Sequence, residues 1–76
     1  MKTDVTAYAT LMEALIAVQR YARELMRKIH DLKTGFAWEL LFDKDLQEEL
    51  RKLEEDLRKC AIRATQIRKE MRGELQ

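Results

Sequence analysis

The stretch TGFAWELLFDKD, residues 34–45, decides how this chain folds. It contains Gly35, one of only two glycines, together with the only tryptophan and both phenylalanines of the protein. The chain has no proline, no serine and no asparagine, so the residues that usually form turns are nearly absent. A chain with so few turn formers reverses direction rarely, and this stretch is the place where we expect the reversal.

Before this stretch, apolar residues recur alternately three and four residues apart, which is the heptad spacing of a helix that packs along one seam. The seam consists of Tyr8, Leu11, Leu15, Val18, Ala22, Leu25, Ile29 and Leu32. Asp4 or Thr6 is suited to cap the start of this helix, and Gly35 in the left-handed conformation is expected to end it. The pattern predicts a helix over about 6–33.

After the stretch, the same spacing returns and predicts a second helix over about 44–72, with Gly73 at its end. Its seam consists of Leu46, Leu50, Leu53, Leu57, Cys60, Ala64, Ile67 and Met71. The phase of the pattern changes near Asp43, where either one helix continues with a stutter or Asp43 caps a new helix. Two long helices of matched length favour the cap and predict a short linking helix over about 36–42.

Charge favours an antiparallel arrangement of the two long helices. Residues 20–33 are mainly basic and residues 43–56 are mainly acidic, and a hairpin lays these two segments side by side. Small Cys60 and Ala64 would also lie opposite large leucines of the first helix, which is how a core fills. The sequence therefore predicts an all-α antiparallel helical hairpin, folded as a single domain over residues 1–76.

The first helix has more apolar surface beside its seam than one partner helix covers. The simplest arrangement that buries this surface is a two-fold homodimer in which the first helix packs on its own copy, giving a four-helix bundle. The sequence leaves open a domain-swapped dimer in which residues 34–45 straighten. The residues predicted for the dimer interface are Met12, Ile16, Tyr21 and Met26. Residues 5–18 have Glu13 as their only charge and are expected to be buried, while being too short to span a bilayer.

The aromatic residues of the central stretch have two interpretations. Phe36, Trp38 and Phe42 would either plug the end of the bundle or anchor a partner protein, since tryptophan and phenylalanine often dominate interfaces.

Nothing in the sequence predicts an enzyme, a cofactor or a metal site. His30 is the only histidine and has no ligand partner at the spacing used in di-iron bundles, and Cys60 lies on the apolar seam. There is no serine nucleophile and no glycine-rich phosphate loop. A single cysteine and the lack of a signal-peptide pattern favour a reducing compartment, which predicts a cytoplasmic protein.

The function predicted first is therefore association, of the chain with itself and, as an extension, with a partner protein. Nucleic-acid binding is an alternative, through a basic group in the second helix: Arg58, Lys59, Arg63, Arg68, Lys69 and Arg72. The expected architecture is similar to that of the Rop plasmid-copy-control family, whose dimeric helical hairpins bind RNA, although no residue motif carries the similarity. The nearly uninterrupted seams also fit a designed or engineered bundle made as a scaffold or binder.

Overall fold

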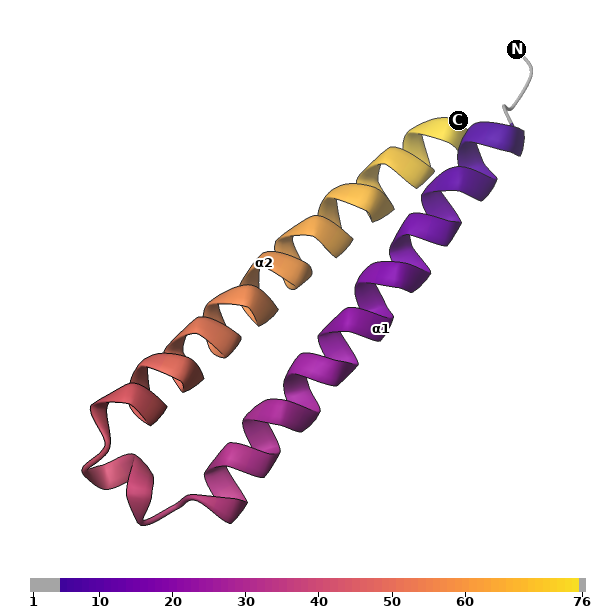
Figure 1. Ribbon diagram of the computed structural model, residues 1–76. Coiled ribbons are helices and arrows are strands. Elements are labelled where there is room, and N and C mark those ends of the chain that lie inside the picture. Colours follow the sequence, from indigo (N-terminus) through magenta and orange to yellow (C-terminus); the bar gives the residue numbers. More distant parts are fainter. Residues whose placement is uncertain (1–4, 76) are drawn as a thin grey trace.

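The computed structural model describes residues 5–75, which form two long helices lying side by side and antiparallel (Figure 1). Helix α1 spans Val5–Gly35 and helix α2 spans Lys44–Leu75, with the 3-10 helix η1, Glu39–Leu41, in the connection between them. The molecule is a rod with extents of 59 × 14 × 13 Å. The prediction of an all-α helical hairpin is confirmed for the single chain.

The core of the rod lies along the two predicted seams. Among residues 5–74, every buried hydrophobic residue belongs to one of them: Leu15, Leu25, Cys60, Ala64, Ile67 and Met71. Leu25 and Ile67 are the most completely buried, at 2% and 0% exposed. Small Ala64 shares a cluster with large Leu15, and Leu11 packs against that cluster. The predicted pairing of large with small residues across the two helices is therefore present.

Helix α1 does not end in the predicted way. Gly35 is its last helical residue, and no glycine among residues 5–75 has a positive φ, so the expected left-handed glycine is wrong. The helix continues because Phe36 N–H donates to the Leu32 carbonyl at 3.0 Å, which extends the helical hydrogen-bond pattern across Gly35. Gly73 is likewise inside α2 and does not end it.

The connection is shorter and tighter than the predicted linking helix over 36–42. Its regular part is only the three residues of η1, because the Leu41 and Phe42 N–H groups donate to carbonyls three residues earlier, each at 3.1 Å. Such 3-10 bonding is common in short connectors and does not extend far.

Asp43 begins α2 as its capping residue. Its Oδ1 accepts hydrogen bonds from the backbone N–H groups of Asp45 at 2.9 Å and Leu46 at 3.3 Å. These are backbone donors that the first turn of a helix leaves without an intrahelical partner. Gln47 ties the connection to α2 by donating its side-chain amide to the Leu40 carbonyl at 2.8 Å. Of the two alternatives for the phase change, the cap is confirmed and the stutter is wrong.

The nearly uncharged segment 5–18 is not buried within one chain, contrary to expectation. Leu15 is its only buried residue, while Val5 is 73% and Ile16 is 41% exposed. The reason is geometric, since α2 covers only one side of α1. Across residues 5–75, neither helix has a stretch both long and apolar enough to cross a membrane.

Candidate association surfaces

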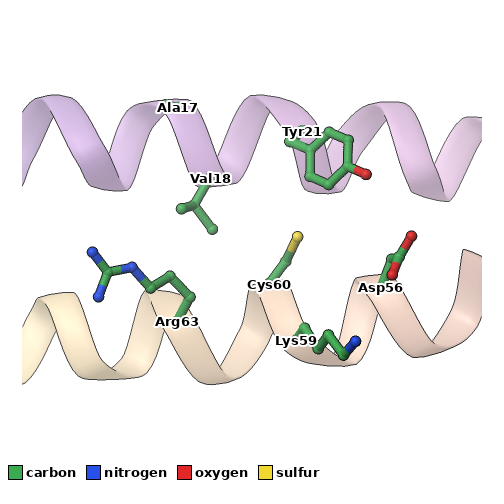
Figure 2. Close-up of a pocket in the computed structure, with 7 residues that line it drawn as sticks. All are labelled: Ala17, Val18, Tyr21, Asp56, Lys59, Cys60 and Arg63. Carbon is green, nitrogen blue, oxygen red and sulfur yellow. The ribbon is translucent and has the colours of Figure 1, made fainter.

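One side of the hairpin is hollowed along the boundary between α1 and α2. A cavity of about 400 Å³ lies near the middle of the rod (Figure 2), where Val18 and Cys60 point toward the opposite helix. Its lining consists of Ala17, Val18, Tyr21, Asp56, Lys59, Cys60 and Arg63. The floor is apolar and charged residues stand along the α2 edge.

A second cavity, of about 520 Å³, continues this hollow toward the open end of the hairpin. It is lined by Ala7, Thr10, Leu11, Glu70 and Glu74. Ala7 and Tyr21 are separated by two heptads, so they lie on the same side of α1, and Ala14 lies between them. We call this side the groove face; it comprises Ala7, Thr10, Ala14, Ala17, Tyr21, Lys59, Arg63, Glu70 and Glu74.

The opposite side of the hairpin has a different character. Lys33 of α1 pairs with Glu54 of α2 at 3.8 Å there, which shows which flanks of the two helices meet. Steps of seven residues from this pair lead to Met26 and Met12 on α1 and to Arg68 on α2. We call this side the methionine face; it comprises Val5, Met12, Ile16, Met26, Lys33, Glu54, Arg58, Arg68 and Arg72.

Three of the four residues predicted for the dimer interface share the methionine face, and Tyr21 does not. Tyr21, 49% exposed, lines the groove face, whereas Met12, Ile16 and Met26 lie on the methionine face, Ile16 being about 40° around α1 from Met12. Ile16 is about 140° around the helix axis from Tyr21, because the two are five residues apart at about 100° per residue. Met12 also packs partly against the core cluster of its own chain. A dimer interface that contains all four would have to include both sides of the α1 seam, and it stays a prediction.

The aromatic residues of the connection are exposed. Trp38 is 74% and Phe42 is 76% exposed, and Phe36 is 47% exposed. Leu41 beside them is 64% exposed. Within one chain they do not plug the end of the hairpin; a plug at the end of a dimeric bundle stays a prediction.

The basic residues suggested for nucleic-acid contact are also divided. Lys59 and Arg63 line the groove face, while Arg68 lies about 140° around α2 from Arg63. Arg72 lies about 40° and Arg58 about 80° around α2 from Arg68, on the methionine face. Lys69 lines a shallow outward-facing hollow with Arg58 and Ile62. The six residues therefore do not form one basic strip.

Ion pairs on the outside of α2 stabilise that helix. Arg51 bonds both carboxylate oxygens of Glu48, at 2.6 and 3.0 Å, and reaches Glu55 at 3.1 Å. The hydrogen bond from Arg51 lowers the pKa of Glu48, and the same bond raises the pKa of Arg51. These pairs are spaced three and four residues apart, as expected on one helix surface.

His30 and Cys60 have different surroundings. His30 is exposed on α1, and Cys60 is a free thiol, 8% exposed, in the core seam. Among residues 5–75, no three histidine, cysteine, aspartate or glutamate side chains gather where they could hold a metal ion.

Comparison of the chain with protein-family models, with curated proteins and with solved structures finds no match. The surfaces of the hairpin must therefore be interpreted from their own chemistry. Of the groove face, sequence reasoning placed only Tyr21 in the predicted interface. The seven-residue repeat Ala7–Ala14–Tyr21 on α1 is visible in the sequence, whereas its position beside the repeat Arg63–Glu70 on α2 was missed.

Proposed function

We propose that this chain is a non-catalytic helical association module that self-assembles as a four-helix bundle made of two hairpins. The observation that carries the proposal is the segment 5–18, which has one charged residue and one buried residue in fourteen positions. A solvated helix surface normally carries charges throughout, as α2 does. A helical surface with few charges and little burial is typical of one that a partner helix covers.

The total surface supports the same proposal. A compact monomer of 9.1 kDa exposes about 4,900 Å², whereas this chain exposes 6224 Å², about 1,300 Å² more. A two-helix rod has this excess because each helix contacts only one neighbour. Packing two rods together gives each helix a second neighbour and removes part of the excess.

Sedimentation equilibrium over a concentration series tests the proposal. We expect a mass that rises from 9.1 kDa toward twice that value as the concentration increases. A mass that stays at 9.1 kDa at every concentration would refute self-association.

A second candidate function is supported by the exposed connection. Trp38, Leu41 and Phe42 are each more than 60% exposed and lie at one tip of the rod. Aromatic residues grouped in this way are suited to anchor a partner protein. Nucleic-acid binding ranks lower, because its six candidate residues are spread over separate sides of α2. A designed origin would change the purpose of the association without changing its chemistry.

A further inference from the structure

We infer that two copies of the hairpin pack antiparallel through the groove face, around a two-fold axis that passes by Ala14 of α1 and between Gln66 and Ile67 of α2. The inference rests on the proposed self-association and specifies its face, orientation and register. In this arrangement α1 lies against the partner's α1, and α2 lies against the partner's α2.

Rotation about this axis sets each cavity of the groove face against the other cavity of the partner. Ala14 is midway in sequence between Ala7 and Tyr21, so Tyr21 lies on the partner's Ala7. The other α1 residues of the cavities follow the same midpoint: Thr10 meets the partner's Val18 and Leu11 meets the partner's Ala17. Each α1 residue lining one cavity therefore faces an α1 residue lining the other.

The sizes of these residues are complementary. Tyr21 is large and half exposed, and the residue it meets, the partner's Ala7, is small. Ala14 at the axis is also small, which allows the two α1 helices to approach closely. Large residues set opposite small ones fill an interface in the same way that they fill a core.

The charges of α2 independently give the same register. The midpoint of Arg63 and Glu70 lies between Gln66 and Ile67, which is also the midpoint of Lys59 and Glu74. Arg63 therefore meets the partner's Glu70. Lys59, whose Nζ is 4.0 Å from the Glu55 carboxylate of its own chain, meets the partner's Glu74. This axis is at the same height as Ala14, because Ile67 packs in one cluster with Leu15. Opposite charges across an interface fix its register and orientation.

The methionine face lacks this self-complementarity. Arg58, Arg68 and Arg72 lie on it near the open end of the hairpin, whereas its acidic residue Glu54 already pairs with Lys33. Two copies that met there through segment 5–18 would bring the arginine-rich ends of both α2 helices together without an acidic partner on that face. Like charges placed opposite each other disfavour that pairing.

The buried area is sufficient for a specific dimer. The axis overlaps residues 5–23 of the two α1 helices and residues 58–75 of the two α2 helices. An overlap of about 28 Å by two helix widths of about 10 Å covers about 560 Å² per chain. The total of about 1,100 Å² clears the lower limit of about 1,000 Å² for a specific interface, so we expect a reversible dimer. The overlap contains the whole of the weakly charged segment 5–18.

A charge-exchange experiment tests the register. Arg63→Glu and Glu70→Arg are prepared as separate full-length variants and studied by sedimentation equilibrium at low ionic strength, alone and mixed in equal amounts. Each variant alone places like charges at both contacts of its dimer and should dissociate about tenfold more readily than the original chain. In the mixture both contacts again join opposite charges, so the dimer should return.

Cross-linking tests the same axis without relying on charge. In a Cys60→Ala background, Ala14→Cys should form a disulfide-linked dimer on mild oxidation, because position 14 meets its own copy at the axis. Ile16→Cys in the same background is the matched control, and it should cross-link far more slowly. Circular dichroism of every variant checks that the helices are retained.

The outcomes separate the two proposals. No dimer of the original chain at any concentration refutes self-association and this inference together. A dimer of the original chain without rescue in the charge-exchange mixture, or with Ile16→Cys cross-linking faster than Ala14→Cys, overturns the groove-face register and leaves self-association standing. A dimer with rescue and with preferred cross-linking at position 14 supports both.

Discussion

The packing of α1 on α2 predicts very different effects for the same substitution at two isoleucines of α2. Ile67 is 0% exposed and packs with Leu15, Ala64 and Met71, whereas Ile62 is 54% exposed on the outer side of α2. Ile67→Ala and Ile62→Ala remove the same atoms from the same helix. Their difference in free energy of unfolding therefore reports the burial of Ile67.

The expected size of the effect follows from the atoms removed. Ile67→Ala takes away three buried carbon groups worth about 0.8 kcal/mol each, and a cavity adds to this loss. Alanine is a better helix former than isoleucine by about 0.4 kcal/mol, which offsets a small part. We expect Ile67→Ala to lower the free energy of unfolding by about 3 kcal/mol, and Ile62→Ala to change it by less than about 0.5 kcal/mol. The total free energy of unfolding of a chain of this size is roughly 4–11 kcal/mol.

Urea unfolding followed by circular dichroism measures both variants. All samples are compared at one protein concentration, because self-association would add a concentration-dependent contribution to stability. Equal losses for the two variants would refute the seam, since they would mean that Ile67 is no more buried than Ile62.

Three further predictions concern the connection and the outer surface. Asp43→Ala should lower the free energy of unfolding by about 1 kcal/mol through loss of the helix cap, while Asp43→Asn keeps an acceptor oxygen and should cost less; equal urea midpoints for all three chains would contradict the cap. The pKa of Glu48 is lowered in the folded chain, so its contribution to stability is present above the unfolded-state pKa and disappears as the pH falls through the folded-state pKa. NMR titration of the Glu48 carboxyl should therefore give a midpoint below that of an unfolded glutamate, and Arg51→Gln should raise this midpoint. An unchanged midpoint in Arg51→Gln would show that the Arg51 hydrogen bond is not the cause of the lowered pKa. Acrylamide should quench Trp38 in the free chain nearly as well as it quenches a small indole, because this side chain is 74% exposed; strong protection at the lowest protein concentration would contradict the exposed connection.

The fold could be predicted because one physical signal dominates it. The heptad spacing places each apolar residue of the two seams, and the six residues that are buried in the described part of the chain belong to those seams. Asp43 was identifiable as a cap because the spacing changes phase at a residue whose carboxylate is suited to bind free backbone N–H groups. An alternating three- and four-residue spacing, kept over a whole helix, shows which side of that helix is buried even before its partner is known.

The helix ends were less predictable, because they depend on small local energies. A glycine inside a helix costs about 1 kcal/mol relative to alanine, which neighbouring hydrogen bonds readily offset. Thr34 donates its hydroxyl to the His30 carbonyl at 2.9 Å, and Phe36 continues the backbone pattern, so α1 passes through Gly35.

The candidate surface was only partly predictable, for a different reason. The excess of apolar residues beside the α1 seam is visible in the sequence. Which α2 residues lie beside each side of that seam is known only once α2 is packed against α1. Tyr21 then lies beside Lys59 and Arg63, and Met26 lies on the side where Lys33 meets Glu54. Choosing interface residues by hydrophobicity alone combines residues from both sides, because hydrophobicity does not show which charged residues flank each one.

The two proposed surfaces occupy different parts of the rod, which makes them separable by experiment. In the groove-face dimer, residues 24–45 extend beyond the partner, so Trp38 stays exposed in the dimer as it is in the single chain. Trp38→Ala should therefore leave the dimer mass unchanged and weaken only the binding of a partner protein to the aromatic residues of the connection. Arg63→Glu should do the reverse, because Arg63 lies within the overlap and far along the rod from the connection. A loss of dimer on substitution of Trp38 would instead place the linker aromatics in the dimer contact, as in the end-plug prediction, and would require a longer overlap than the groove face provides.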